Sequence, residues 1–471
     1  MKPVAIIGAG ITGLTAAFEL QKRGVPVAIY EASRRAGGVI RTVRQDSFMA
    51  ECGPNTLLET SPAIPALFRE LGIADQALPS DSRAKNKYVI RRGRPVPMPS
   101  SPSEFFTSEL FSPGAKLRLL KEPFVPRSAP EIEESLAAFV VRRLGTEFLD
   151  YAITPFVAGV YAGDPWKLSV REAFGKVYEL EQRYGSLIGG QILGARERKR
   201  TGGVSKQNAP KVSFTGGLDT LTNALAAKLG ANLHLGQKLD RLEEVEGGWR
   251  LELNCDGQKD VANHSAVILT APAYSLTDLP LRSDLHVSLG FLRRISYAPV
   301  SSVVLGYRRE QVEHPLDGFG FLVPEVENLN ILGAIFSSSL FPNRAPDGHV
   351  LITCYLGGLR SPELPFRDVA HQIGLVRADL EKTVGVIGAP VFSHHAVYPR
   401  AIPQYELGYA KIRREIEAVE IKCPGLYFGG NYHRGVSLGD SLLNGLALGE
   451  RVSEFVRTVS QSSPGAFLAA A

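Results

Sequence analysis

Three glycines near the start of the chain have the spacing of a dinucleotide phosphate site. The stretch from Gly8 to Gly13 reads Gly-Ala-Gly-Ile-Thr-Gly and follows a short apolar run, Pro3 to Ile7. The first glycine permits a tight turn, the second lets the backbone approach a pyrophosphate, and the third lets a helix pack closely on the strand. The N–H groups at the start of that helix then favour bound phosphate.

An acidic residue, Glu31, follows a second apolar run that extends from Pro26 to Tyr30. Glu31 lies eighteen positions after Gly13 (31 − 13). A carboxylate at this place accepts hydrogen bonds from a ribose diol and repels a 2′-phosphate, which predicts FAD or NAD and excludes NADP. The surrounding pattern is strand, turn, helix and strand, so we expect an α/β fold with a Rossmann-type domain.

The length, composition and charge limit the number of domains and the kinds of partner that the protein can have. A chain of 471 residues has room for two or three domains. The net charge of +5 is compatible with an anionic substrate or anionic lipid, and the basic run from Gly194 to Gln207 lacks the aromatic residues that nucleic-acid binding would need. We expect no signal peptide, because the cofactor strand starts at Pro3, and no membrane-spanning helix.

The cysteines and histidines predict neither a disulfide frame nor a metal site. The cysteines are far apart in the sequence: Cys52, Cys255, Cys354 and Cys423. Their spacing favours reduced thiols in a cytoplasmic protein. The adjacent pair His394 and His395 is expected on a strand, with the two rings on opposite faces and a structural role.

Two further stretches separate FAD from NAD. The stretch from Glu31 to Thr42 contains a Gly-Gly pair followed by an arginine, and the stretch from Glu51 to Thr56 reads Glu-Cys-Gly-Pro-Asn-Thr. Both resemble segments of the flavin family that includes amine oxidases, phytoene desaturases and porphyrinogen oxidases. The resemblance implies non-covalent FAD held by Gly8, Ala9, Gly10, Ile11, Thr12, Gly13, Glu31, Ala32, Gly37, Gly38, Arg41, Gly53, Pro54, Asn55, Thr56, Leu239, Ala271, Gly430, Val436, Ser437 and Leu438.

Several later stretches are similar to the porphyrinogen oxidase branch of that family. They cover nearly the whole chain in the expected order: 156–169, 317–324, 356–358, 402–405 and 435–440. The first of them looks like the substrate-site loop of that branch, and the last leads into a long final helix whose N-terminus is expected around Val436 to Leu438. The resemblance implies oxidation of protoporphyrinogen IX to protoporphyrin IX, with six electrons leaving in three hydride transfers to FAD, oxygen as acceptor and hydrogen peroxide as product. No side-chain acid or base and no metal is required, because the protein only has to position a methylene bridge.

The same resemblance implies a set of residues that contact the substrate: Lys87, Gly159, Phe319, Leu322, Leu340 and Tyr355. The Gly159 carbonyl is expected to accept a pyrrole N–H, and Lys87 to pair with a propionate. The family often has arginine at the Lys87 position, and lysine keeps the charge but loses the two-pronged geometry. A surface lysine on a strand is the plain alternative for this residue.

Other functions are compatible with the same sequence. A coproporphyrinogen III oxidase, which forms coproporphyrin III, would have to accept four carboxylates, and Arg91, Arg92 and Arg94 flank Lys87 on the same hairpin. A different FAD-dependent desaturase or amine oxidase is a more distant alternative. A non-catalytic FAD-fold binding protein is disfavoured by the intact motif with Glu31 and Arg41. The electron acceptor and the oligomeric state, including a homodimer, stay open.

The predicted domain organisation is discontinuous. The FAD-binding domain comprises residues 1–82, 208–285 and 419–460. The substrate-binding domain comprises a hairpin at 83–101 and residues 286–418. A helical insert spans 102–207, and a mobile tail spans 461–471.

The region from Phe105 to Phe124 combines aromatic residues with lysine and arginine. Such a region either packs inside the protein or contacts the inner face of the cell membrane, which would make this a peripheral membrane protein.

Overall fold

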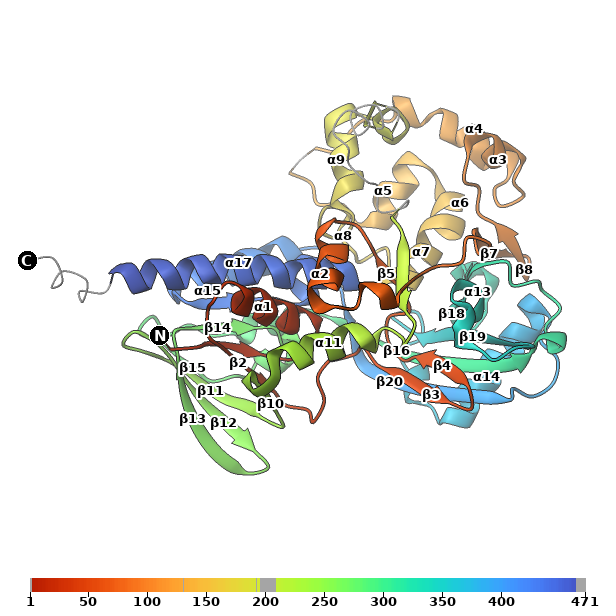
Figure 1. Cartoon of the computed structure of the whole chain (residues 1–471). Helices are drawn as coiled ribbons and strands as arrows, with labels where there is room; N and C mark the ends of the chain where they lie inside the picture. Colours follow the sequence, from red (N-terminus) through yellow and green to blue (C-terminus); the bar gives the residue numbers. More distant parts are fainter. Residues whose placement is uncertain (1, 130, 192, 195–208, 463–471) are drawn as a thin grey trace, which may run out of the picture.

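The computed structural model describes residues 2–129, 131–191, 193–194 and 209–462 (Figure 1). Its first sheet is parallel and five-stranded, in the order β10-β2-β1-β14-β21. These strands are β1 (Val4–Ile7), β2 (Val27–Glu31), β10 (Leu233–Leu235), β14 (Ala266–Leu269) and β21 (Leu426–Phe428). All four residues of β1 are buried, which confirms the prediction that this apolar run is an internal strand.

Helices cover one face of the parallel sheet, and a second sheet covers the other. The helices on the first face are α1 (Ile11–Lys22), α2 (Ala63–Leu71), α11 (Asp219–Leu229) and the long α17 (Leu438–Ser462), which lies along α1 (Figure 1). The opposite face packs on a four-stranded sheet made of β13 (Gln258–His264), β12 (Gly248–Cys255), β11 (Lys238–Val245) and β15 (Leu281–Arg282). This arrangement confirms a Rossmann-type α/β domain assembled from separate parts of the chain.

A seven-stranded mixed sheet forms the second body, in the order β20-β16-β19-β18-β17-β7-β8. Its strands are β7 (Asn86–Arg91), β8 (Arg94–Pro97), β16 (Tyr297–Arg308), β17 (Gly318–Leu322), β18 (Ile331–Phe336), β19 (His349–Gly357) and β20 (Phe392–Pro403). Helix α14 (Val369–Val384) packs on one face. The other face turns toward the first domain, whose hairpin β3 (Thr42–Gln45) and β4 (Phe48–Glu51) packs against it.

A helical insert lies at the top of the view in Figure 1. Its helices are α3 (Pro102–Thr107), α4 (Pro113–Leu120), α5 (Leu136–Arg143), α6 (Thr146–Phe148), α7 (Thr154–Tyr161), α8 (Val170–Ala173) and α9 (Gly175–Tyr184). A π-helical turn, Leu149–Ile153, joins α6 to α7. After the insert, the chain returns to the first domain through β9 (Lys211–Phe214), which pairs between β5 (Leu57–Leu58) and β6 (Ala77–Pro79) in a three-stranded sheet.

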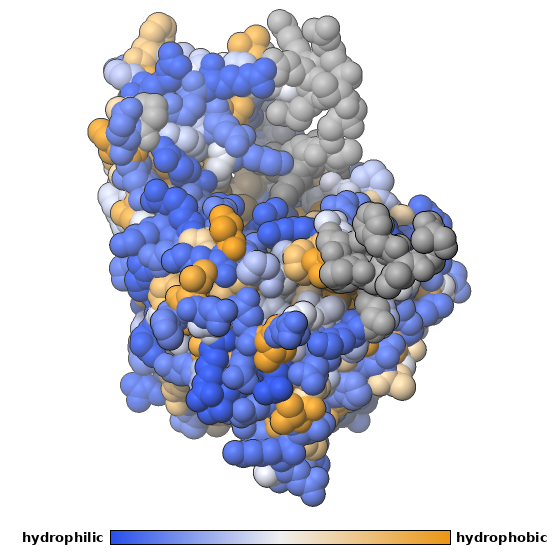
Figure 2. Space-filling view, turned by 90° about the vertical axis from the view of Figure 1, so that its left-hand side faces the viewer, coloured by the Kyte–Doolittle hydropathy of each residue, from blue (hydrophilic) through white to orange (hydrophobic). Residues whose placement is uncertain are grey.

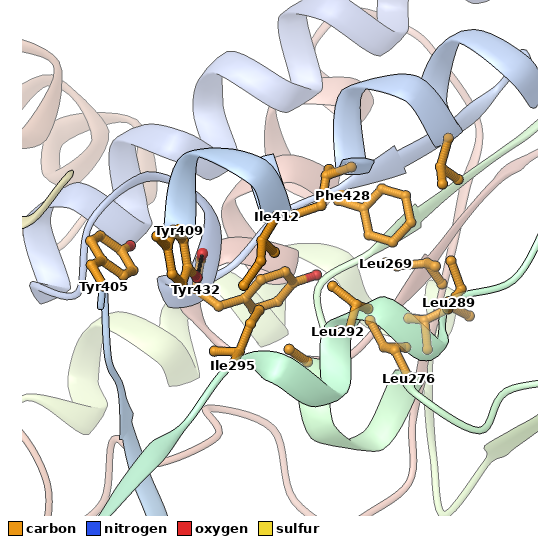
Figure 3. Close-up of a cluster of buried hydrophobic side chains, with 14 of the residues drawn as sticks. Leu269, Leu276, Leu289, Leu292, Ile295, Tyr405, Tyr409, Ile412, Phe428 and Tyr432 are labelled. Carbon is orange, nitrogen blue, oxygen red and sulfur yellow. Dashed lines mark hydrogen bonds between the residues drawn. The ribbon is translucent and has the colours of Figure 1, made fainter. Parts of the chain in front are cut away.

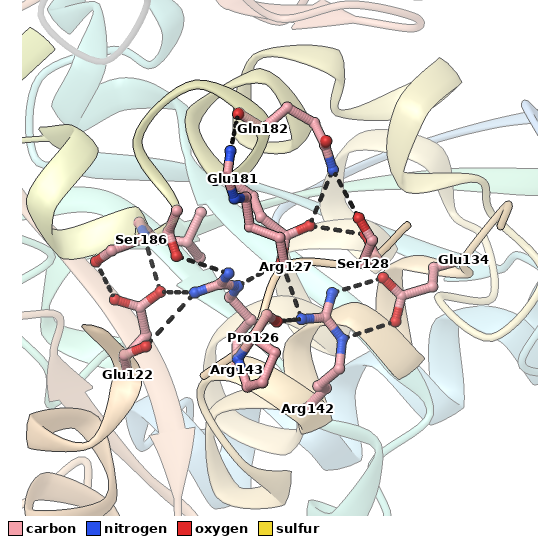
Figure 4. Close-up of polar contacts among 12 residues, drawn as sticks. Glu122, Pro126, Arg127, Ser128, Glu134, Arg142, Arg143, Glu181, Gln182 and Ser186 are labelled. Atoms are coloured by element: carbon pink, nitrogen blue, oxygen red, sulfur yellow. Dashed lines mark hydrogen bonds and ion pairs between the residues drawn. The ribbon is translucent and has the colours of Figure 1, made fainter. Parts of the chain in front are cut away.

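Charged side chains are buried inside the insert. The Arg143 guanidinium has no exposed surface and forms ion pairs with Glu122 and Glu181 at 2.6 Å each. Arg142 extends the same network to Glu134 and Glu181 (Figure 4). The network ties α5 to α9 and to the 3-10 turn Glu122–Phe124, so it fixes how the pieces of the insert pack.

The structure differs from the sequence-based expectations in one place. The stretch from Phe156 to Tyr161 is expected to be part of a loop but is helical, because the apolar run continues the helix that the π-helical turn begins; the loop starts at Ala162, where φ is +46°. The predicted basic loop from Gly194 to Gln207 lies almost entirely outside the described residues, as does the tail after Ser462. The domain boundaries themselves stay a prediction.

Candidate active site

The glycine turn at the carboxyl end of β1 has the shape that a pyrophosphate needs. Gly8 has φ of +107°, which favours glycine. A Cβ atom on Gly13 would lie 2.0 Å from the Gly8 carbonyl oxygen, so only glycine lets α1 pack this closely on the turn. A Cβ on Gly10 would meet nothing within 4 Å, which leaves open space above the helix N-terminus. The open side of the turn therefore fits the phosphates of a dinucleotide.

Glu31 lies beside this turn at the end of β2. One carboxylate oxygen accepts a hydrogen bond from the Ala9 N–H at 2.7 Å, and the other accepts from the Ser33 N–H at 2.8 Å. The carboxylate is thus held next to the phosphate-binding loop, where a ribose diol would reach it. Ala32, the neighbouring residue, is exposed on the same rim.

The Gly-Gly pair packs against the same loop. The Gly37 N–H donates to the Ala9 carbonyl at 2.8 Å, and a Cβ on Gly38 would lie 3.3 Å from the Gly10 Cα. Both glycines have positive φ, +102° and +59°. Arg41 follows with an exposed side chain, and its carbonyl accepts from the Cys52 N–H.

The segment from Cys52 to Thr56 joins the first domain to the seven-stranded sheet. The Asn55 side-chain amide donates to the Tyr355 hydroxyl at 2.5 Å. The Cys52 sulfur lies 3.3 Å from His394 Nε2, while His395 reaches Ser301 on the opposite face of the strand, as predicted for adjacent residues. Burial raises the pKa of the Tyr355 phenol, so this hydroxyl stays neutral and can act as donor or acceptor.

The last glycine segment, from Gly430 to Gly435, contains the short helix α16 (Asn431–Arg434) and leads into α17. Tyr405 and Tyr409 lie beside Tyr432 of this segment (Figure 3). The Tyr405 hydroxyl donates to the Asn431 carbonyl at 2.6 Å and accepts from the Gly435 N–H at 2.8 Å. The Tyr409 hydroxyl donates to the Tyr432 carbonyl. Val436 and Ser437 come directly before α17, which starts at Leu438, as the sequence predicts.

Two further predicted cofactor residues border the same region. Ala271 follows β14 next to Gly8, since its amide nitrogen would lie 3.1 Å from a Cβ on Gly8. Leu239 is half-buried on β11 at the edge of the core under the parallel sheet. Together with the glycine loops, these positions trace one continuous path along the carboxyl ends of the parallel strands, which is where such sheets bind dinucleotides.

The helix α7 presents Gly159 to the seven-stranded sheet. A Cβ on Gly159 would lie 2.7 Å from Leu322 Cδ2, so glycine allows the close approach. The neighbouring carbonyls of Ala158 and Tyr161 accept hydrogen bonds from the Ala162 N–H and the Gln404 side chain. Within the described residues the Gly159 carbonyl has no such donor, as is typical of a helix C-terminus. It can therefore accept a hydrogen bond from a ligand.

The predicted apolar contacts are distributed along one side of the sheet. Leu322 pairs with Gly333, and Gly333 pairs with Tyr355, so their positions lie in one row across β17, β18 and β19. Phe319 is half-buried at a bulge in β17. Leu340 is fully buried, and its carbonyl accepts from the Asp81 N–H. The structure thus brings Gly159, Leu322 and Tyr355 close to the FAD-domain segment at Asn55.

Lys87 lies in β7, two positions before Val89, the residue that continues this row. It pairs with Gly320, and Val89 pairs with Leu322, so Lys87 faces the same side as Leu322. Its side chain is exposed. Arg91, in contrast, forms an ion pair with Glu147 at 2.9 Å and lies over the Tyr151 ring, so its charge is already neutralised within the insert.

One residue that the sequence does not single out takes part in the site. The sequence indicates Tyr405 only as part of a stretch that resembles the family, and the structure shows that its hydroxyl holds the segment from Asn431 to Gly435 in place.

Known proteins share this sequence pattern and fold. Residues 11–452 match the flavin containing amine oxidoreductase family, so the chain belongs to that family. It is 33% identical over 485 residues to protoporphyrinogen oxidase 2, chloroplastic/mitochondrial, of Arabidopsis thaliana, covering 98% of this chain and 95% of the relative. It is 29% identical over 469 residues to coproporphyrinogen III oxidase of Bacillus subtilis (strain 168), covering 95% and 97%.

The fold comparison agrees with the sequence comparison. A crystal structure of a protein from Exiguobacterium sp. 255-15 superposes with a TM-score of 0.80 at 23% identity, covering 96% of this chain and 99% of that chain. The protein is therefore an FAD-dependent oxidoreductase with a mixed α/β fold. Among the described residues, no helix is both long enough and apolar enough to cross a membrane.

Proposed function

We propose that this protein oxidises protoporphyrinogen IX to protoporphyrin IX in porphyrin biosynthesis. The observation that carries the proposal is that Gly159 of α7 lies against the row that contains Leu322 and Tyr355, which combines a free carbonyl with apolar surface beside the Asn55 segment of the FAD site. A flexible tetrapyrrole offers pyrrole N–H groups and apolar faces that match this row. Relatives that bear the name protoporphyrinogen oxidase are 33–34% identical to the chain.

The side chains and backbone of the protein would bind and orient the substrate and the cofactor, and they would transfer no proton themselves. The Gly159 carbonyl accepts a pyrrole N–H, Leu322 and Tyr355 pack on the ring, and Lys87 pairs with a propionate. The glycine loops from Gly8 to Gly13 and from Gly430 to Gly435 hold the dinucleotide. When bound, FAD supplies the two-electron oxidation, and oxygen as acceptor completes each of three cycles.

Coproporphyrinogen III is the second candidate substrate. The coproporphyrinogen III oxidase of Bacillus subtilis is 29% identical to the chain. A substrate with four carboxylates needs cations on more than one side of the site. Arg91 forms an ion pair with Glu147, so it does not supply a cation for a substrate carboxylate. The absence of Arg91 from the site favours a substrate whose carboxylates lie on one edge.

Anaerobic reduction of the bound flavin tests these substrates directly. The purified yellow protein is mixed with protoporphyrinogen IX, coproporphyrinogen III or an amine such as putrescine, and bleaching is followed by absorbance. We expect fast bleaching with protoporphyrinogen, slower bleaching with coproporphyrinogen and none with the amine. Bleaching by the amine alone would overturn the proposal in favour of an amine oxidase.

We also propose a peripheral membrane contact through the insert. Four apolar side chains on α3, α4 and the following turn are exposed: Phe106, Leu117, Leu120 and Phe124, the last by 86%. Phe105, in contrast, packs inward with Phe111 and Phe148, so only part of the predicted aromatic surface is available. Exposed apolar groups beside the cationic Lys121 suit an anionic lipid surface.

The face shown in Figure 2 does not offer a comparable patch. There, apolar side chains form small groups separated by hydrophilic ones, as expected for ordinary solvent-exposed surface. The exposed apolar residues of α4 and its following turn are instead close together in sequence and share one short segment. This concentration supports α4 as the contact region.

A further inference from the structure

An arginine, Arg360, lies at the end of the strand that carries Leu322. It belongs to the loop that follows β19. One of its guanidinium nitrogens, Nη2, donates to the Val323 carbonyl at 2.9 Å. Val323 comes directly after Leu322, the residue of β17 that packs on Gly159. The guanidinium is therefore fixed at the carboxyl end of β17, next to the row that contains Leu322 and Tyr355.

The loop of Arg360 is also tied to the helix that carries Gly159. The Leu359 N–H donates to the carbonyl of Ala162, the residue that ends α7, at 2.7 Å. Gly358 has φ of +67°, and a Cβ atom there would lie 2.5 Å from the same carbonyl oxygen, so the loop lies directly against α7. Arg360 is thus held between α7 and β17, the two elements that supply Gly159 and Leu322.

The other guanidinium nitrogen of Arg360, Nη1, has no hydrogen-bond partner among the described residues, although the atom is buried. A charged donor that leaves water without gaining an acceptor costs free energy, so such a group indicates an acceptor that comes from outside the chain. Burial also lowers the pKa of the Arg360 guanidinium, as expected for a charge that is poorly compensated.

The acidic side chains nearest to this guanidinium do not neutralise it. Glu325 is the carboxylate whose charge opposes the effect of burial on the pKa of Arg360, but Glu325 is exposed, and within the described ranges the two form no ion pair. Glu327, in the same turn, already accepts from the backbone between β7 and β8 and from the Tyr151 hydroxyl. The charge of Arg360 is therefore available to a ligand.

The position of Arg360 distinguishes it from a second arginine with the same bonding pattern. Arg309 donates through Nη2 to the His314 carbonyl at 2.6 Å, and its Nη1 is also buried without a partner in the described part of the chain. The Arg309 N–H, however, donates to Gly348, which precedes β19, whereas Arg360 follows that strand. Arg309 therefore lies at the opposite end of the sheet, away from Gly159 and Leu322.

We propose that Arg360 binds a carboxylate of the substrate, a propionate in the case of protoporphyrinogen IX, and acts as a specificity-determining residue. The inference rests on the proposed function, because the tetrapyrrole supplies the carboxylate. An ionised carboxylate is the acceptor that a guanidinium binds most strongly. Nη1 donates to this carboxylate while Nη2 stays on the Val323 carbonyl, so one side chain connects the substrate to β17.

The test compares Arg360→Met with Arg360→Lys and Arg309→Met. We expect Arg360→Met to raise KM for protoporphyrinogen about tenfold with little change in kcat, because the propionates are remote from the reacting methylene bridge. Arg360→Lys keeps the charge but loses the fork, so its KM should fall between those of wild type and Arg360→Met. Arg309→Met removes the same pattern of hydrogen bonds at the other end of the sheet and should leave KM unchanged.

Binding without turnover gives an independent readout. Protoporphyrin IX and its dimethyl ester are titrated in the same detergent, with the quenching of protein fluorescence as signal. Arg360→Met should weaken binding of the dicarboxylic acid about tenfold and leave binding of the ester unchanged. If Arg360→Met does not fold, Arg360→Lys decides, because the loss of the fork should still weaken the acid and not the ester. The Tm of each variant shows whether its fold is intact.

The outcomes separate this inference from the proposed function. If the wild type oxidises neither porphyrinogen but substitution of Arg360 still weakens the acid and not the ester, the proposed function fails and the carboxylate site stands. If oxidation proceeds and the Arg360 variants change neither KM nor the preference for acid over ester, the role of Arg360 is overturned. Equal weakening of acid and ester, or the same weakening in Arg309→Met, would also overturn it, because the effect would then be one of packing.

Discussion

At the scale of single residues, Glu31 gives a clear test of the cofactor site. Its carboxylate lies next to the phosphate-binding turn, held by the Ala9 and Ser33 N–H groups. Glu31→Ala should weaken FAD retention by about 1.5–3 kcal/mol, the value of a hydrogen bond to a charged group. The measurement is the dissociation constant of FAD for the refolded or deflavinated protein.

The matched control for Glu31 is Glu246→Ala, which removes an exposed carboxylate from a turn between β11 and β12. It should leave FAD retention unchanged. Glu31→Gln keeps an acceptor oxygen and should fall between wild type and the alanine variant. FAD retention by Glu31→Ala as tight as in the wild type would show that the ribose assignment is wrong.

Tyr405 tests how the last glycine loop is positioned. Tyr405→Phe removes a hydroxyl that serves both the Asn431 carbonyl and the Gly435 N–H. Leaving these groups unsatisfied should cost about 1–3 kcal/mol of stability and should weaken FAD binding, because the loop precedes α17. Urea unfolding and FAD titration measure the two effects separately.

Tyr307→Phe provides the comparison for Tyr405→Phe. Tyr307 is equally buried, but its hydroxyl has no hydrogen-bond partner among the described residues. Its removal should be neutral or slightly stabilising and should not affect FAD. A loss of FAD affinity that is the same in both variants would argue against a specific role for Tyr405.

At the scale of elements, the buried charges join α5 and α9 and should make the insert sensitive to acid. Burial would raise the pKa of Glu181, but Arg142, Arg143 and Ser128 outweigh it and hold that pKa below its usual value. The pKa of Glu122 is also lowered. Burial would raise it, but hydrogen bonds from the Ser186 hydroxyl and the Arg143 guanidinium outweigh burial. Because the pKa of these carboxyl groups is lower in the folded protein, the unfolded chain binds more protons than the folded one as the pH falls. The stabilisation is therefore complete above about pH 4.3, the ordinary glutamate pKa. It is lost as the pH falls through the lowered pKa values of the folded protein.

Glu181→Gln should therefore destabilise the protein by about 3–5 kcal/mol at neutral pH, because Arg143 is left buried with one partner fewer. The difference from the wild type should shrink as the pH falls below about 4.3, where the wild-type carboxylates also become protonated. Urea unfolding at neutral and acid pH measures both. Glu109→Gln makes the same change at an exposed position of the insert and should have no effect, whereas a constant difference across pH would contradict the electrostatic account.

At the scale of the whole molecule, the exposed apolar segment of the insert predicts where the protein meets a lipid surface. Vesicles that contain anionic lipid should sediment the wild type at low salt, and the double variant Leu120→Ser, Phe124→Ser should stay in solution. Both side chains are exposed, by 55% and 86%, so the fold should tolerate the change. Phe366→Ser, exposed by 62% in the substrate domain, is the control, and equal loss in both would move the contact elsewhere.

The sequence by itself determined the parts that depend on local geometry. These parts all lie within about thirty residues of one another. They are the glycines that need positive φ or close backbone approach, the acidic residue after the second strand, and the buried apolar strands. The spacing of Gly8, Gly13 and Glu31 alone was therefore enough to place the phosphate-binding turn and the ribose carboxylate. The start of the last helix near Ser437 followed from the resemblance of residues 435–440 to the family, and the structure shows the cap that fixes it, because the Ser437 hydroxyl accepts from the Asp440 N–H at 3.1 Å.

Only the tertiary structure decided the arrangements that depend on residues far apart in the chain. The pairing of Arg91 with Glu147 removed an arginine that the sequence left as a carboxylate partner. Gly159 packs closely on Leu322 of β17, where a Cβ atom on Gly159 would lie 2.7 Å from Leu322 Cδ2, although the two residues are far apart in the sequence. In each case the deciding interaction is between segments whose separation in sequence hides their proximity.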